Sequence, residues 1–253
     1  MNPAQRLLGI YDKLIGQQKD QSMKLTWAVV FDLDENDPHL EDKVTSCVVA
    51  LRKQIDFTSE RLAEMDVPAD LTAPGFPRFK EVSSPGHLNA SWNGLRGNIQ
   101  QPECRQAFMW SSWILRNQVE KEISAEDLQE LLDEVAELEE SIADTEMSPI
   151  LRNFIQQQIA SIKEALILSR AQGSRPIYEA VEKFAGACAI NRDIINAEVA
   201  KSPSKTKELF TKFGGFLKKT AEAADTLDKL KTLADNVSNG VDAAKPFITQ
   251  LLS

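Results

Sequence analysis

The sequence predicts an all-α protein, a multi-helix up-down antiparallel bundle that ends in a long C-terminal amphipathic helix. Apolar residues recur at spacings of three and four through most of the 253 residues, which is the period of one helix face. Ser, Asp or Asn precedes Pro or acidic residues at several expected helix starts, as in helix caps. Tyr, which strands favour, occurs twice, and Gly and Pro occur 11 times each. The composition therefore favours helices over sheets.

Residues 1–65 are expected to form N-terminal helices. Asn2-Pro3 indicates a cap and the first position of a short helix that ends near Ile15. Residues 19–33 are compatible with a helix face or with a buried strand, because their apolar residues fit both patterns. A second helix start at Asp37-Pro38 opens a long amphipathic helix.

Residues 66–86 are predicted to be a proline-rich loop, because they hold four prolines and Gly75. Structureless loops of this length are uncommon in compact domains and are often functional. Phe76 and Phe79 within it are aromatic side chains suited to docking. We therefore expect the loop to contribute to a partner-binding surface.

Residues 87–201 are expected to form a central antiparallel helical bundle. Two helices are predicted over 87–99 and 102–122. Three longer helices begin near Ser124, Ser148 and Ser174, each about 22–25 residues and roughly 33–38 Å long. Short connections between helices of similar length produce antiparallel neighbours. Residues 204–253 follow as a C-terminal amphipathic segment, in one domain with the rest or as a separate part.

Charge is distributed unevenly along this acidic chain, whose net charge is −9. Residues 120–146 hold twelve acidic residues and one basic residue. Such a run is either a solvated helix face or a docking strip for a basic partner. The candidate partner-binding residues here are Glu126, Glu130, Asp133, Glu137 and Glu140.

The opposite bias occurs over residues 201–219, which hold six lysines and one glutamate interleaved with apolar residues. A basic amphipathic segment of this kind can lie on a membrane or dock onto a partner. The same phenylalanines could instead complete the bundle core while the lysines face water or the acidic helix. The candidate arm residues are Lys205, Lys207, Phe210, Lys212, Phe213, Phe216, Lys218 and Lys219.

Residues 29–36, Val-Val-Phe-Asp-Leu-Asp-Glu-Asn, carry two aspartates directly after an apolar run. This string resembles the first motif of haloacid-dehalogenase-type phosphatases, in which a strand presents two aspartates as nucleophile and acid/base. Glu35 and Asn36 stand where that family has Gly and Thr. The resemblance implies a metal-dependent phosphatase built around Asp32 and Asp34.

Other catalytic and cofactor motifs are missing from the sequence. The two histidines and three cysteines form no zinc-ligand spacing, and no glycine-rich phosphate loop occurs. The three cysteines are expected to be buried, unreactive thiols. The acidic composition disfavours nucleic-acid binding, and nothing indicates a small-molecule substrate, cofactor or metal.

The leading hypothesis is a cytoplasmic, bacterial, non-enzymatic module that binds another protein or a second copy of itself. The alternative is a membrane-recruited effector of toxin or antiviral type acting through residues 204–253, which would then reside at the membrane periphery. The phosphatase is the third hypothesis.

Overall fold

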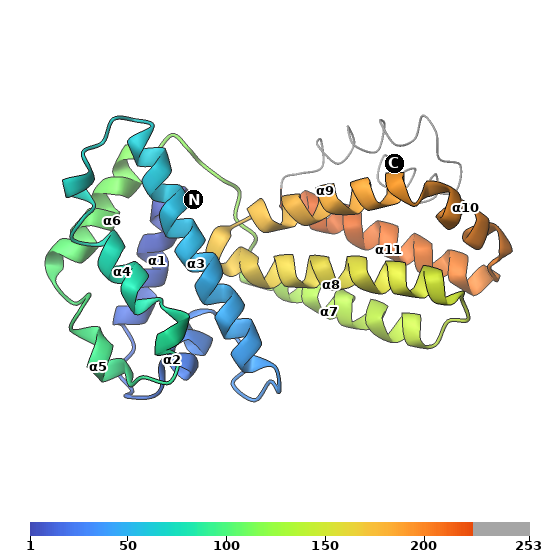
Figure 1. Cartoon of the computed structure of the whole chain (residues 1–253), viewed down its shortest axis with the longest axis horizontal. Coiled ribbons are helices and arrows are strands. Elements are labelled where there is room, and N and C mark those ends of the chain that lie inside the picture. The colour runs from blue at the N-terminus through green and yellow to red at the C-terminus, as the bar shows by residue number, and fades with distance from the viewer. Residues whose placement is uncertain (225–253) are drawn as a thin grey trace. The chain divides into compact units, whose positions relative to one another are not determined.

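The computed structural model describes residues 1–224, except for the side chains of residues 189, 192, 196, 200 and 207. This part of the chain is mostly helical and contains no strand, only an isolated antiparallel bridge between Ser22 and Ser91. The all-α prediction is therefore confirmed (Figure 1). The chain divides into two compact units, which we describe separately. Unit 1 comprises Met1–Glu120 with Arg170–Gly173, and unit 2 comprises Lys121–Ser169 with the residues from Ser174 onward.

Unit 1 is built from six α-helices and two short 3-10 helices. They are α1 (Pro3–Ile15), α2 (Met23–Val30), α3 (Leu40–Ala63), η1 (Ala69–Leu71), α4 (Phe76–Val82), η2 (Pro85–His87), α5 (Trp92–Arg96) and α6 (Pro102–Ile114). Helix α1 packs against α2, α3 and α6, and α4 packs against α3 and α6. The Asn2 side chain caps α1 by accepting a hydrogen bond of 2.8 Å from the Gln5 amide, as the sequence predicted.

Aromatic side chains fill the core of unit 1. The ring of Phe108 stacks on Phe76 with centroids 4.9 Å apart and meets Phe79 edge-on at 5.4 Å. Trp27 from α2 stacks on Phe31 at 5.4 Å. Buried Tyr11 donates a hydrogen bond of 2.7 Å to the Ile99 carbonyl oxygen, and burial raises the pKa of this phenol to about 12. These rings bury large apolar areas, so they hold the short helices together.

Three expectations for residues 1–122 need correction or refinement. The segment 66–86 is not an extended loop, because α4 and two 3-10 helices occupy most of it and two phenylalanines of α4 enter the core. Residues 23–30 are a helix, so the strand alternative is wrong. The helix expected over 87–99 is reduced to α5, and the one expected over 102–122 ends at Ile114. In the first case the rings of α4 are buried in the core of unit 1, which the proline and glycine content of the segment did not indicate.

Unit 2 contains the helices α7 (Ala125–Ala143), α8 (Pro149–Gln172), α9 (Arg175–Ile190), α10 (Arg192–Lys201) and α11 (Ser204–Ala223). The last three residues of α8 are grouped with unit 1. The helix expected from Ser174 to about residue 199 is interrupted at Asn191, which separates α9 from α10. The predicted central domain 87–201 is also divided differently, since residues 87–120 belong to unit 1.

One apolar core joins α7, α8, α9 and α11. Each helix contributes a stripe at spacings of three and four, for example Leu128, Leu131, Val135, Leu138 and Ile142 of α7. The Thr206 hydroxyl, at the start of α11, donates a hydrogen bond of 2.9 Å to the Glu146 carbonyl oxygen, just after α7. At the other end of α11, Lys121 Nζ donates a hydrogen bond of 2.7 Å to the Glu222 carbonyl oxygen. Helix α11 therefore runs alongside α7 in the opposite direction (Figure 1).

The residue directly after α8, Gly173, lies so close to the Arg6 side chain that only glycine fits there. Gly173 adopts a φ of 67°, and a Cβ added there would lie 2.3 Å from Nη2 of Arg6. Arg6 is itself buried and its Nη2 lies 2.8 Å from Oε2 of Glu120. The guanidinium group therefore occupies the space that any larger residue at position 173 would need.

We expect Gly173→Ala to lower the free energy of unfolding by roughly 1–3 kcal/mol, because it combines a strained φ with a steric clash. Urea unfolding of the full chain followed by circular dichroism measures this. Gly186→Ala is the control, since no atom lies within 4 Å of a Cβ at that position of α9. That substitution should raise stability by about 0.5–1 kcal/mol. Equal effects at both positions would contradict the packing described here.

Candidate interaction surface

Helix α7 separates apolar and acidic side chains on opposite faces. Ser124 caps it by accepting a hydrogen bond of 3.0 Å from the Asp127 amide, and acidic residues in the first turn favour the positive end of the helix dipole. With its apolar stripe in the core of unit 2, the remaining positions meet solvent. We define the acidic face as the exposed carboxylates of Glu126, Glu130, Asp133, Glu137 and Glu140.

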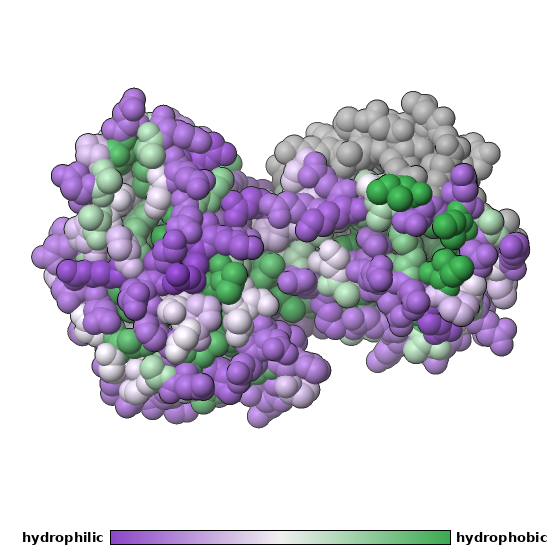
Figure 2. Space-filling model, viewed as in Figure 1, coloured by the Kyte–Doolittle hydropathy of each residue, from purple (hydrophilic) through white to green (hydrophobic). Residues whose placement is uncertain are grey.

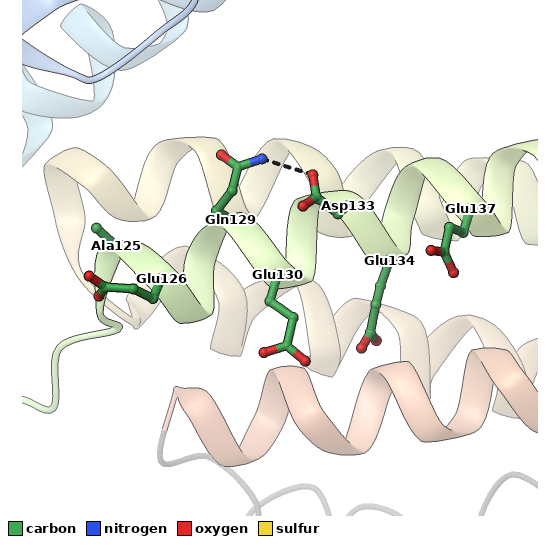
Figure 3. Close-up of a pocket in the computed structure, with 7 residues that line it drawn as sticks. All are labelled: Ala125, Glu126, Gln129, Glu130, Asp133, Glu134 and Glu137. Carbon is green, nitrogen blue, oxygen red and sulfur yellow. Dashed lines mark hydrogen bonds between the residues drawn. The ribbon is translucent and has the colours of Figure 1, made fainter.

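The acidic face borders an open hollow of about 750 Å³ along α7. Its lining consists of Ala125, Glu126, Gln129, Glu130, Asp133, Glu134 and Glu137 (Figure 3). Glu130 and Glu134 extend from α7 toward α11, whereas Gln129 and Asp133 lie on another side of the helix and are joined by a hydrogen bond of 2.8 Å. The structure thus brings four of the five predicted acidic residues to one hollow, and Glu140 lies beyond it on the same helix.

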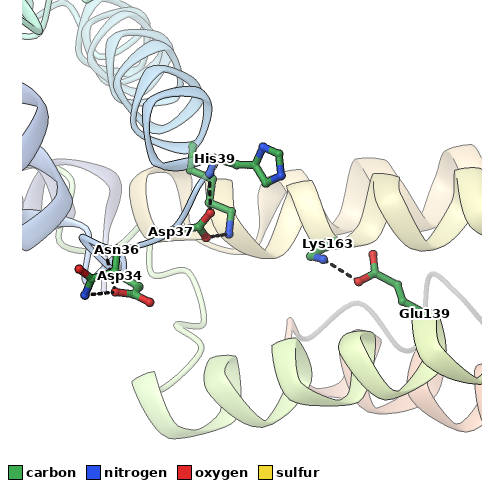
Figure 4. Close-up of polar contacts among 7 residues, drawn as sticks. Asp34, Asn36, Asp37, His39, Glu139 and Lys163 are labelled. Carbon is green, nitrogen blue, oxygen red and sulfur yellow. Dashed lines mark hydrogen bonds and ion pairs between the residues drawn. The ribbon is translucent and has the colours of Figure 1, made fainter.

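Few cations neutralise these carboxylates within the described part of the chain. Lys219 of α11 binds Glu134 and lies 3.2 Å from Glu130 Oε1, and these hydrogen bonds raise the pKa of the Lys219 ammonium. Lys163 of α8 pairs with Glu139 at 2.7 Å (Figure 4). Among the side chains that the structure describes, none forms an ion pair with Glu126, Asp133, Glu137 or Glu140. The acidic face is therefore largely uncompensated.

The predicted basic arm contributes to the core of unit 2 over residues 204–224. Phe210, Phe213 and Phe216 are all buried, and Phe213 meets Phe184 of α9 edge-on with centroids 5.5 Å apart. Lys205, Lys212 and Lys219 are exposed, and Lys218 is half-buried. The Lys207 side chain and residues 225–253 lie outside the described residues. Of the two alternatives, the structure therefore supports the one in which these phenylalanines complete the core, where α11 packs against α7 and α9.

None of the described helices combines the length and the apolar character that crossing a membrane requires.

The two phenylalanines predicted to contact a partner are core residues of unit 1. Phe76 and Phe79 of α4 are almost completely buried against α1 and α6. Gly75 permits this packing, because a Cβ there would lie 2.8 Å from the Cys104 carbonyl oxygen. Neither ring is available to a partner, so the prediction for these two residues is corrected.

The segment 32–37 forms a turn between α2 and α3. Asp34 Oδ1 accepts hydrogen bonds from the Asn36 amide and side chain, and Asp37 Oδ1 accepts one of 2.7 Å from the His39 amide (Figure 4). Lys43 binds the other oxygen of Asp37, and this contact lowers the pKa of the Asp37 carboxyl. The carboxylates are thus occupied in stabilising the turn and the start of α3.

The local structure of residues 23–34 differs from that of the phosphatase motif that the sequence resembles. The motif needs a strand that presents the first aspartate, whereas the preceding residues form α2 and Asp32 adopts a left-handed φ of 52°. Asp32 pairs with Lys13 at 3.0 Å. Among the described residues no three His, Cys, Asp or Glu side chains cluster as metal ligands would. The backbone around Asp32 and Asp34 therefore differs from the strand ending that the motif has.

Some exposed apolar groups were not anticipated from the sequence. Trp110 and Trp113 of α6 are 62% and 61% exposed, and the Arg116 guanidinium lies 4.2 Å from the Trp113 ring centroid. In unit 2, Ile150 and Ile194 border a groove between α8 and α10. The sequence pattern placed Ile194 on an apolar stripe, and only tertiary packing shows that this position remains uncovered.

Comparison with protein-family models, with curated proteins and with solved structures finds no match to this chain. Functional inference therefore rests on the geometry of the described residues.

Replacing Phe213 tests whether α11 is core or a free arm. We expect Phe213→Ala to lower the free energy of unfolding by about 3–5 kcal/mol, because it leaves a cavity among buried rings. Lys212→Ala, at an exposed position of the same helix, should change it by less than about 0.5 kcal/mol. Thermal and urea unfolding measure both. Unchanged stability in Phe213→Ala, together with loss of binding to anionic vesicles, would instead favour a membrane arm.

The three thiols are expected to be unreactive in the folded protein. Burial raises the pKa of both Cys47 and Cys188 to about 12 and also raises the pKa of Cys104. At pH 8 a thiol with this pKa is about one part in ten thousand thiolate. We expect no labelling by a disulfide reagent within minutes in native buffer, and three labelled thiols in guanidinium chloride. Rapid labelling of Cys47 or Cys104 in native buffer would contradict its burial, and rapid labelling of the partly buried Cys188 would contradict its raised pKa.

Proposed function

We propose that this chain is a non-enzymatic interaction module whose acidic face binds a Lys- or Arg-rich segment of a partner protein. The observation that carries the proposal is the row of exposed, largely uncompensated carboxylates along the hollow of α7. Because the opposite face of α7 is committed to the core, the row is held on a regular helix rather than on a loop.

Electrostatics support a charged partner. Like charges at helical spacings of three and four repel one another and reduce helix stability by a few tenths of a kcal/mol per pair. A cationic partner would relieve this repulsion and would be attracted over roughly 8–10 Å, the screening length at physiological salt. Complementary charge mainly increases the association rate and the selectivity. Binding should therefore weaken markedly as salt is raised.

The dimensions of the hollow favour a polypeptide over a small ligand. Residues 126 to 137 span about 16 Å along the helix axis at 1.5 Å per residue. The hollow is open, and its lining contains no aromatic or large apolar side chain. Pockets for drug-sized ligands are enclosed, whereas this hollow is open to solvent. Phosphate-bearing nucleic acids would be repelled by it.

The finer architecture belongs to the same proposal. We infer that unit 2 is an up-down antiparallel bundle, extended beyond residue 224 by a further amphipathic segment. The opposite directions of α7 and α11 and their shared core support this arrangement. A rigid bundle would present the acidic face to a partner without rearrangement, and a cytoplasmic setting is the expected one.

We expect neutralising the acidic face to abolish partner capture. The test variant replaces Glu126, Glu130, Glu137 and Glu140 with Gln and Asp133 with Asn. Tagged full-length chains serve as baits in extracts of the source cell. The capture is done at about 50 mM salt, where charges are weakly screened, and at about 200 mM salt, where they are strongly screened. Quantitative mass spectrometry should show partners rich in Lys and Arg on the parent chain at low salt. These partners should fall at least tenfold on the variant.

The matched control removes the same number and types of charge from unit 1. Its substitutions fall at exposed positions and are Glu35→Gln, Glu60→Gln, Glu81→Gln, Glu103→Gln and Asp70→Asn. Net charge then equals that of the test variant, so non-specific attraction is equal in both. Equal loss of partners from both variants would refute a specific role for the acidic face, and so would unchanged capture by the test variant.

A further inference from the structure

An apolar groove lies at the end of unit 2 where α8 begins. It has a volume of about 330 Å³ and is lined by Ile150, Leu151, Asn153, Phe154, Gln157, Asn191, Ile194, Ile195 and Glu198. Ile150 is 59% exposed and Ile194 is 51% exposed, and the nearby residue Ile190 is 85% exposed. We call this feature the isoleucine groove.

The exposed apolar groups of unit 2 are concentrated at this one end. Ile150, Ile190 and Ile194 are the large hydrophobic residues of its described part that reach such exposure. Figure 2 shows separate hydrophobic patches over the region of α10 on an otherwise largely hydrophilic face. Exposed apolar groups gathered at one end of a unit are candidates for an interaction site.

The last described residue, Ala224, lies far from the isoleucine groove. Helix α11 begins beside Glu146, four residues before Ile150, and ends beside Lys121. Ala224 is therefore at the opposite end of unit 2 from the isoleucine groove. The 20 residues of α11 cover about 30 Å between the two ends.

The sequence that follows Ala224 is long enough to reach back to the isoleucine groove, and its apolar residues have a helical spacing. Residues 225–245 would cover about 32 Å as a helix, which matches the length of α11. Their apolar residues recur at helical spacings, at Leu227, Leu230, Ala234, Val237 and Val241. Pro246 then precedes Phe-Ile-Thr-Gln-Leu-Leu at residues 247–252. This hexapeptide would arrive at the end of unit 2 that carries the groove.

We propose that residues 247–252 of the same chain occupy the isoleucine groove. The hexapeptide holds four large apolar residues and no charged residue. The groove matches it, since its lining is isoleucine, leucine and phenylalanine rimmed by three amide side chains and a single charge, Glu198. Amides on the rim suit the Thr and Gln of the hexapeptide as hydrogen-bond partners. This docking is independent of the acidic face on α7.

The test is a cysteine pair in the full chain, Ile194→Cys with Leu251→Cys. Position 194 is half exposed, so the substitution leaves the core intact. The protein is treated at low micromolar concentration with a mild oxidant and, in parallel, with a short bis-maleimide that tolerates imperfect geometry. Peptide mapping by mass spectrometry identifies the cross-linked residues and separates them from any product of native cysteines.

We expect the 194–251 cross-link to form within single chains at least tenfold more efficiently than in a control pair, Gln129→Cys with Leu251→Cys. Gln129 is exposed on α7, away from the groove. Adding Leu252→Asp to the 194–251 pair should reduce the yield at least fivefold. Cross-links between two chains would show that a second copy fills the groove and would overturn the proposal. Equal yields in the two pairs, or none in either, would also overturn it.

Discussion

Burial of one apolar stripe per helix is the constraint on which unit 2 depends. Its core draws on α7, α8, α9 and α11 together, and with no strand among residues 1–224 it is this core that holds the helices side by side. Once Leu131 and Val135 face inward, the remaining positions of α7 must face outward. The acidic face is therefore a consequence of the same periodicity that builds the core, and the chemistry of the surface is coupled to the stability of the helix beneath it.

Unit 1 depends on a different kind of packing. Apart from α3, its helices have 13 residues or fewer. Aromatic rings from α1, α2, α4 and α6 pack together in its core. Two glycines admit close approaches that no other residue would allow, Gly75 against the Cys104 carbonyl and Gly173 against Arg6. Such contacts depend on specific shapes, so unit 1 should tolerate fewer substitutions than the repeated stripes of unit 2.

Charge and apolar surface occupy different parts of unit 2. Carboxylates line the hollow of α7, and Lys219 pairs with two of them, Glu130 and Glu134, whereas the exposed isoleucines gather where α8 and α10 meet. The acidic hollow suits a cationic chain that arrives from solution, because its attraction is long-ranged and weakened by salt. The isoleucine groove suits an uncharged apolar segment, because burial of apolar surface would be the main stabilising term of that contact. The two features could therefore act independently in one small domain.

The sequence by itself determined the helical class, the starts of α1, α7 and α8, and the acidic stripe of α7, because capping and periodicity are local properties. It left open the state of residues 23–30, and it misassigned Phe76 and Phe79 as surface residues within a loop. Only the tertiary structure decided that Phe213 lies in a core and that Ile194 does not. Both residues sit on apolar stripes, and a stripe becomes core or surface according to whether another element covers it. Coverage depends on contacts between residues far apart in sequence, which periodicity does not encode.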